Sequence, residues 1–194
     1  TTIDAVSTEK SVRIDKPSES EYEKFVGLEH FVSGDLKLKN YGSTSDLNSA
    51  MKLFSKGDLL FARRNAYLKR ASVADFEGVC SGDATVIEQN DKLINEFLVL
   101  IFNSSRFWNY SVSNAAGTMS KRVKWRDLAK YTFKLPPKDE QEKILNLFLT
   151  LEKQIEQTEE QEKNLLQTKR QLLGELFSNK RNFGKYLTAA NYEI

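Results

Sequence analysis

The stretch "LPPKDEQEKI" (residues 135–144) divides the chain into two parts of different character. Its two prolines end the element before them, because proline lacks a backbone N–H and fixes φ. Asp139, followed three residues later by Glu142, resembles a capping box at the start of a helix. No proline occurs from there to Ser178, and forty helical residues would span about 60 Å. A domain of this size cannot cover so long a helix, so the helix is predicted to need a partner.

The apolar residues of this helix recur in steps of four and three, the heptad pattern of a coiled-coil seam. The predicted interface residues are Ile144, Phe148, Leu151, Ile155, Leu165, Leu172 and Leu176. Polar Thr158, Glu162 and Lys169 interrupt the middle of the series. An antiparallel partner is favoured, because it brings Lys169 near Glu162 or Glu159 of the other chain. The alternative is a helix that folds back on its own domain, with Gly174 offering a break.

The part before the prolines combines short apolar runs with one helical stripe, which predicts an α+β domain with an irregular β-sheet and helices. "GDLLFAR" (57–63) begins with a turn pair and continues as a buried strand. The other expected elements are an extended lead-in at 1–20, strands within 22–31, 71–89 and 131–137, and a helix from Asp91 to near Ser105. The predicted fold class is therefore α+β followed by one long α-helix that forms an antiparallel coiled coil. The predicted divisions are 1–137, the globular domain, 138–179, the long helix, and 180–194, a C-terminal tail.

Composition leaves little room for catalysis by this chain. Cys80 and His30 are the sole cysteine and histidine among 194 residues, which excludes an internal disulfide and a Cys-based zinc site. We find no Gly-rich phosphate loop and no Asn-Pro-Pro motif of base methylation. The chain is therefore predicted to hold no metal, no cofactor and no catalytic residues. No signal segment or membrane-length apolar run is present, so a cytoplasmic location is expected.

Charge is distributed unevenly, although the net charge is only +2. Residues 139–178 hold nine acidic and five basic residues, so the rest of the chain carries +6. Arg, Asn, Tyr, Lys and Thr side chains contact base edges and phosphates. On this ground the candidate DNA-binding residues are Arg63, Arg64, Asn65, Tyr67, Lys69 and Arg70 on one loop, Thr118, Ser120, Lys121, Arg122 and Lys124 on a second, and Asn40, Tyr41 and Ser43 on an early loop. The alternative for each residue is ordinary surface solvation.

Several segments, in this order, resemble the DNA-specificity subunit of type I restriction–modification enzymes. They are "KGDLLFAR" (56–63), "FLVLIFNSSRFW" (97–108), "AAGTMSKRVKWRDLAKYTFKLPPKDEQEKI" (115–144) and the helix that ends "LLQTKRQLLGELF". The "LPPKDEQEKI" junction is the most specific of them. The resemblance covers roughly residues 22–178. Because the family has two such domain-plus-helix units and this chain has one, the resemblance implies a half-length subunit, a truncated form or an isolated domain.

The resemblance implies a target recognition domain that reads one half of a split DNA site, and a helix that docks methyltransferase subunits. Those partner subunits would bind S-adenosylmethionine, and a second copy of the chain or another specificity half would complete an inverted-repeat reader. One alternative is a coiled-coil interaction scaffold with only non-specific nucleic-acid binding. Another is an RNA-binding module, which would need exposed aromatic platforms; Tyr41, Tyr67 and Trp125 are too scattered to favour it.

Overall fold

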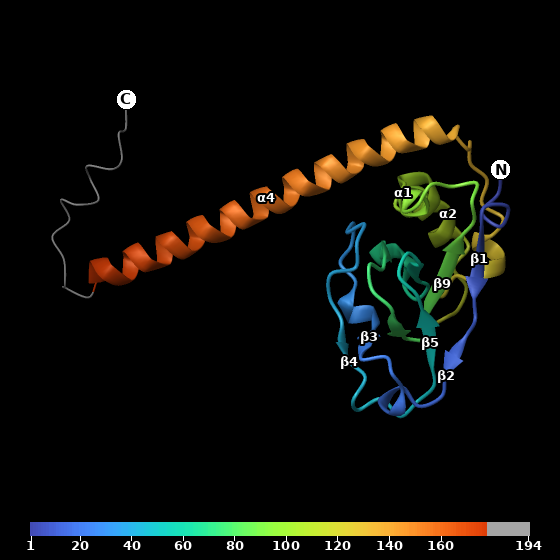
Figure 1. Cartoon of the computed structure of the whole chain (residues 1–194), viewed down its shortest axis with the longest axis horizontal. Coiled ribbons are helices and arrows are strands. Elements are labelled where there is room, and N and C mark those ends of the chain that lie inside the picture. The colour runs from blue at the N-terminus through green and yellow to red at the C-terminus, as the bar shows by residue number, and fades with distance from the viewer. Residues whose placement is uncertain (178–194) are drawn as a thin grey trace. The chain divides into compact units, whose positions relative to one another are not determined.

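The computed structural model describes residues 1–177 (Figure 1). Contacts divide the chain into two compact units, Thr1–Leu145 and a second that begins at Asn146. The strands are β1 (Ser7–Lys10), β2 (Arg13–Ile14), β3 (Lys24–Val26), β4 (Gly42–Ser43), β5 (Met51–Phe54), β6 (Leu59–Ala62), β7 (Ala71–Val73), β8 (Gly78–Cys80) and β9 (Ala84–Gln89). The helices are α1 (Phe97–Phe102), α2 (Ser105–Ser113), α3 (Trp125–Leu128) and α4 (Lys138–Phe177), with 3-10 turns at Pro17–Glu19, Leu28–His30 and Ala66–Leu68.

The first sheet has the order β1-β9-β6-β7, and its pairs are all antiparallel. Strand β6 is central, and its side chains alternate between two hydrophobic clusters. Leu59 and Phe61 belong to one cluster, and Leu60 and Ala62 belong to the other. Because both faces of the strand are covered, all four residues are buried and the sequence shows a continuous apolar run there. The predicted buried strand is confirmed.

The larger cluster packs helices α1 and α2 against the first sheet, and Figure 1 shows both helices beside β9. Aromatic rings dominate the contact. Phe61 stacks on Trp108 with ring centroids 5.5 Å apart, and Phe102 lies 4.1 Å from Phe107. Each buried aromatic side chain of this kind contributes on the order of 1.5–3 kcal/mol through its removal from water. Strand β6, which leads into the basic segment 63–70, therefore packs against this aromatic core.

The second sheet has the order β2-β5-β8-β3-β4 and is mixed, because β3 and β8 run parallel. Its strands have two to four residues. It packs through the smaller cluster, which includes Val26, Phe31, Phe54 and Cys80. The irregular sheet architecture that the sequence predicted is present, and the short strands predicted within 71–89 are β7, β8 and the longer β9.

The expectations for residues 1–20 and 131–137 were wrong. The lead-in at 1–20 contains β1, which pairs with β9, and Ile3 and Val6 are fully buried. Strand β1 has the polar sequence STEK, because it lies at the edge of its sheet, and so hydrophobic alternation did not reveal it. The strand expected at 131–137 is reduced to one isolated bridge between Thr2 and Thr132.

The helical stripe after Asp91 also folds differently from its prediction. Helix α1 begins at Phe97, with Glu96 rather than Asp91 at the N-cap. Helix α2, which the sequence analysis missed, follows after two residues. Ser104 is its N-cap, and the Ser104 hydroxyl accepts a hydrogen bond from the Phe107 N–H at 3.3 Å. The helix was predicted to end near Ser105, but Ser104 caps the start of a second helix there.

Helix α4 begins at Lys138, directly after the two prolines, and continues without a break through Gly174 to Phe177. Asp139 lies in its first turn rather than at the N-cap. The fold is thus α+β with one long C-terminal helix, as predicted. Pairing of α4 in a coiled coil and the domain divisions stay predictions, and the predicted tail lies outside the described residues. Within residues 1–177, no helix has both the length and the apolar composition that a bilayer span requires.

Candidate functional site

The first basic loop follows β6 and contains two residues with left-handed backbone conformation. Asn65 (φ 55°) and Lys69 (φ 51°) flank the 3-10 turn Ala66–Leu68. Asparagine tolerates this region well, whereas lysine adopts it at some cost. Buried Ala66 anchors the turn, and Tyr67 and Lys69 are exposed. The sequence "RRNAYLKR" therefore forms a tight, anchored loop.

The second basic loop is a turn closed by two backbone hydrogen bonds between Ala116 and Arg122, at 3.0 and 2.9 Å. Gly117 has φ +124°, and a Cβ there would come within 3.0 Å of the Ser120 carbonyl oxygen, so glycine is required at this position. The tip, residues 118–121, consists of a threonine, a fully exposed methionine, a half-buried serine and an exposed lysine. It presents short polar groups and one cation.

The two loops are bonded to each other, although about sixty residues separate them. The Asn65 N–H donates to the Lys121 carbonyl at 2.9 Å, and the Val123 N–H donates to the Arg63 carbonyl at 2.9 Å. The Arg64 Nε donates to the Ser120 hydroxyl at 2.6 Å. Most of the residues predicted to contact DNA therefore lie on one joined surface.

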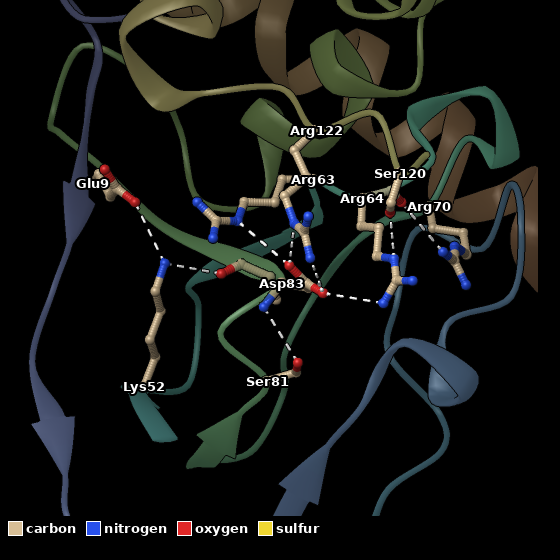
Figure 2. Close-up of polar contacts among 10 residues, drawn as sticks. Glu9, Lys52, Arg63, Arg64, Arg70, Ser81, Asp83, Ser120 and Arg122 are labelled. Carbon is tan, nitrogen blue, oxygen red and sulfur yellow. Dashed lines mark hydrogen bonds and ion pairs between the residues drawn. The ribbon is translucent and has the colours of Figure 1, made fainter. Parts of the chain in front are cut away.

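Asp83, in the turn before β9, lies between three arginines of these loops (Figure 2). Arg122 makes two hydrogen bonds to the carboxylate, Nε to Oδ1 at 2.7 Å and Nη2 to Oδ2 at 3.2 Å. Arg64 Nη1 lies 3.5 Å from Oδ2, and Arg63 Nε lies 4.0 Å from Oδ1. Three guanidinium groups thus share one carboxylate, which leaves the cluster with two uncompensated positive charges. We call these four residues the Asp83 cluster.

Protonation equilibria in the cluster follow from these contacts. The hydrogen bond from Arg122 is the largest cause that lowers the pKa of Asp83, and the positive charges of Arg122, Arg63 and Arg64 lower it further, against an opposing effect of burial. The same hydrogen bond raises the pKa of Arg122 above its ordinary value. The Asp83 side chain is 18% exposed. Asp83 and Arg122 therefore both stay charged at neutral pH.

Arg70, predicted as a DNA contact, is instead directed at the protein backbone. Its Nη1 donates to the Leu28 carbonyl at 2.8 Å. Its Nη2 lies 3.5 Å from the Arg64 carbonyl (Figure 2). Burial is the main cause that lowers its pKa. Arg70 holds the base of the first loop, and its guanidinium is less available to a ligand than that of Arg64.

The early-loop candidates lie in a different part of the fold, at and before β4 in the second sheet. The Tyr41 ring packs edge-on against Phe76 at 5.1 Å, and the Lys24 ammonium lies 4.7 Å from its centroid. The Ser43 hydroxyl bonds to Ser45. Asn40 is exposed. The structure does not bring these three residues into the Asp83 cluster.

Among the remaining candidates, Thr118 and Lys124 are exposed beside the cluster. The seven residues predicted for the helix interface are all exposed along α4. Asp83 is the residue that sequence reasoning missed, because "SGD" (81–83) carries no local sign that it lies beside the basic loops. Only the pairing of β6 with β9, which sets Ala62 opposite Ala84, shows that this turn lies beside the first loop.

Comparison with known proteins finds one consistent group of relatives. A family model described as the type I restriction modification DNA specificity domain matches residues 8–168. The type I restriction enzyme EcoDI specificity subunit of Escherichia coli is 27% identical over 129 residues, and the match covers 63% of this chain and 29% of that protein.

Two solved structures share the fold. The HsdS subunit from Thermoanaerobacter tengcongensis matches with a TM-score of 0.67 and 22% identity, over 89% of this chain and 46% of that one. The type I restriction–modification S subunit from M. genitalium matches with a TM-score of 0.62 and 18% identity, over 96% of this chain and 47% of that one. The chain therefore spans about half the length of the solved relatives, and the matched region covers less than a third of the E. coli protein.

Proposed function

Because the chain belongs to the type I restriction–modification DNA specificity family, we propose that it recognises a specific DNA sequence through the surface formed by its two basic loops. The observation that carries this proposal is the Asp83 cluster, where side chains from both loops meet. Positive charge localised on one face attracts a polyanion far more than a net charge of +2 suggests. Arginine is also the side chain that pairs bidentately with guanine in the major groove.

The loops also supply the two kinds of contact that recognition needs. Exposed Lys121 and Lys69 are suited to phosphates, which position a protein on the duplex. Asn65, Thr118 and the arginines are suited to base edges, which carry the sequence information. The hydrogen bonds between the loops hold these groups in a fixed arrangement, and a fixed arrangement is what discrimination among bases requires.

We assign α4 to assembly. Its apolar residues are exposed at both ends of the heptad series, and Leu165 is 71% exposed. A second copy paired antiparallel would cover these residues, and it would present two identical recognition surfaces to an inverted-repeat site. Methyltransferase subunits docked on the same helix would bind S-adenosylmethionine and carry out methyl transfer, and this chain would contribute recognition only.

The experiment that tests the proposal is selection from a pool of duplexes with a randomised central segment, using the full chain. An enriched motif is expected, and gel-shift titration is expected to give tighter binding to that motif than to a scrambled duplex of equal composition. Equal affinity for both duplexes would contradict sequence recognition and leave the alternative of a coiled-coil scaffold with non-specific nucleic-acid binding.

A further inference from the structure

The contact between Arg122 and Asp83 differs in kind from the other contacts of the cluster. Arg122 uses the Nε–Nη2 side of its guanidinium in two hydrogen bonds to the two carboxylate oxygens, at 2.7 and 3.2 Å. Arg64 makes only one approach to this carboxylate, at 3.5 Å, and its Nε is bonded to Ser120 instead. Arg63 lies 4.0 Å away, and its buried Nε has no hydrogen-bond partner. Only Arg122 therefore has its orientation fixed by a bidentate pair.

Asp83 is itself held by the backbone. Its N–H donates to the Ser81 hydroxyl at 3.2 Å, and its carbonyl accepts from the Arg63 N–H at 3.0 Å. The carboxylate is thus fixed relative to the end of β6, the strand whose four residues are buried in the two cores. A chain of contacts runs from that strand through Asp83 to the guanidinium of Arg122.

Counting N–H groups shows what Arg122 has left for a ligand. A guanidinium carries five N–H donors, and the pair with Asp83 uses two of them. Both Nη1 donors and the second Nη2 donor remain, and one Nη1 donor and the free Nη2 donor point in parallel from the Nη1–Nη2 end of the group. Two parallel donors on one edge match the O6 and N7 acceptors of guanine, and the Arg122 side chain is 43% exposed.

We infer that Asp83 is a positioning residue that orients Arg122 to read one guanine of the recognised sequence. This inference rests on the proposed function. Because an arginine side chain has several rotatable bonds, a free Arg122 would meet phosphates and bases in many orientations. Bonded to Asp83, it presents its remaining donors in one direction.

A competing interpretation makes Asp83 a blocker that occupies arginines which DNA must take over. The two interpretations differ in what removal of the charge does. A blocker, once removed, leaves tighter binding to every sequence with unchanged discrimination. A positioning residue, once removed, leaves discrimination lowered at one base pair, whatever happens to the overall affinity. The ratio of affinities, rather than either affinity, therefore separates them.

The test uses the full chain and the duplex motif that the wild type enriches from a randomised pool. Affinities are measured for that motif and for duplexes in which each guanine–cytosine pair is replaced in turn. Asp83→Asn, which keeps the shape and removes the charge, and Arg122→Lys, which keeps the charge and removes the fork, are expected to lose discrimination at the same base pair. The expected loss is roughly tenfold to a hundredfold for each. The double variant is expected to lose no more than either single one, because the two residues act as a unit.

Asp83→Glu serves as the second variant and thermal melting as the check on folding. Moving the carboxylate by one methylene is expected to lower discrimination at that same base pair without removing the charge. Unchanged discrimination in both Asp83 variants, or losses at a different base pair from Arg122→Lys, would overturn the inference and leave the proposed function intact. A uniform gain of affinity with Asp83→Asn would favour the blocker and overturn it as well. A wild type that enriches no motif overturns the proposed function and this inference together.

Discussion

The side-chain oxygen Oε1 of Gln141 accepts a hydrogen bond from the backbone N–H of Ile94 at 3.0 Å. The amide nitrogen of the same side chain donates to the carbonyls of Pro136 and Lys92 at 2.9 and 3.2 Å. Gln141 is 1% exposed, so one buried amide joins the first turn of α4, the segment before it and the segment before α1.

Replacing Gln141 with methionine is expected to lower the free energy of unfolding by about 2–3 kcal/mol, because it leaves buried backbone groups without partners. Urea unfolding followed by the fluorescence of buried Trp108 measures the change. Glu142→Gln, at the exposed neighbouring position, is the control and is expected to change little. Equal free energies of unfolding for the two variants would show that Gln141 does not stabilise this junction.

Cys80 is expected to resist thiol reagents in the native protein. It is fully buried, and burial raises the pKa of its thiol to about 12, whereas the thiolate is the reactive form. A chromogenic disulfide at pH 8 should therefore label the chain only as fast as it unfolds, and at once in denaturant. Fast native labelling at pH 8 would contradict the described packing of β8.

The same thiol predicts an alkaline loss of stability. The pKa is about 12 in the fold against an ordinary value of 9.0, so the unfolded chain gives up its proton first. The contribution is complete below pH 9 and is lost as the pH rises toward 12. In Cys80→Ala, stability measured by urea unfolding should fall less steeply over this window. Parallel curves for variant and wild type would show that other groups cause the alkaline loss.

The lowered pKa of Asp83 predicts a loss of folding stability at acidic pH. Its pKa lies below the ordinary value, chiefly through the hydrogen bond from Arg122, so its stabilisation is present above the unfolded pKa and is lost as the pH falls through the folded one. Asp83→Asn is expected to be less stable than the wild type by about 1–3 kcal/mol at pH 7. That gap should close below about pH 4. Asp75→Asn, at an exposed position, is the matched control for removal of one carboxylate and should differ little in stability from the wild type at pH 7.

The apolar face of α4 predicts self-association. Leu151→Asp combined with Leu165→Asp is expected to convert a dimer into monomers, because charges at heptad positions cannot be buried in a seam. Light scattering measures the mass in solution. Gln157→Asp with Gln161→Asp adds the same two charges off the predicted seam and should leave the dimer intact. An unchanged dimer in the leucine variant, or a monomeric wild type, would contradict the assignment of α4.

Lys121 is expected to contribute through charge alone. Lys121→Ala should weaken binding to the preferred and the scrambled duplex alike, and it should reduce the slope of log affinity against log salt by about 1. Gel-shift titrations at several salt concentrations measure both effects. A loss confined to the preferred duplex would instead make Lys121 a base contact.

Local signals in the sequence predicted those elements whose causes are local. The continuous apolar run of β6 and the proline boundary before α4 follow from burial and from proline geometry, and both were identified. Strand β1 was missed because its partner, β9, is about eighty residues away, and its own sequence is polar. Helix α2 was missed because Ser104 serves two helices in succession.

The candidate site shows the same limit. Composition identified Arg63, Arg64 and Arg122, since basic loops are visible in the sequence. It did not identify Asp83, because the importance of a single carboxylate depends on which turn lies beside it. It placed Arg70 among the DNA contacts and gave no sign that this side chain is hydrogen-bonded to the Leu28 carbonyl. Residue type predicts the chemistry of a site, whereas pairing between distant segments decides its members.

The hydrogen bonds between Asn65 and Lys121 and between Arg64 and Ser120 constrain how a new DNA-sequence preference can evolve. A chimera that takes residues 61–71 from a relative and keeps its own 115–125 would join two halves that never evolved together. New sequence preferences should therefore arise by exchange of both loops along with the turn at 81–83, and mutations in one loop should change the effect of mutations in the other.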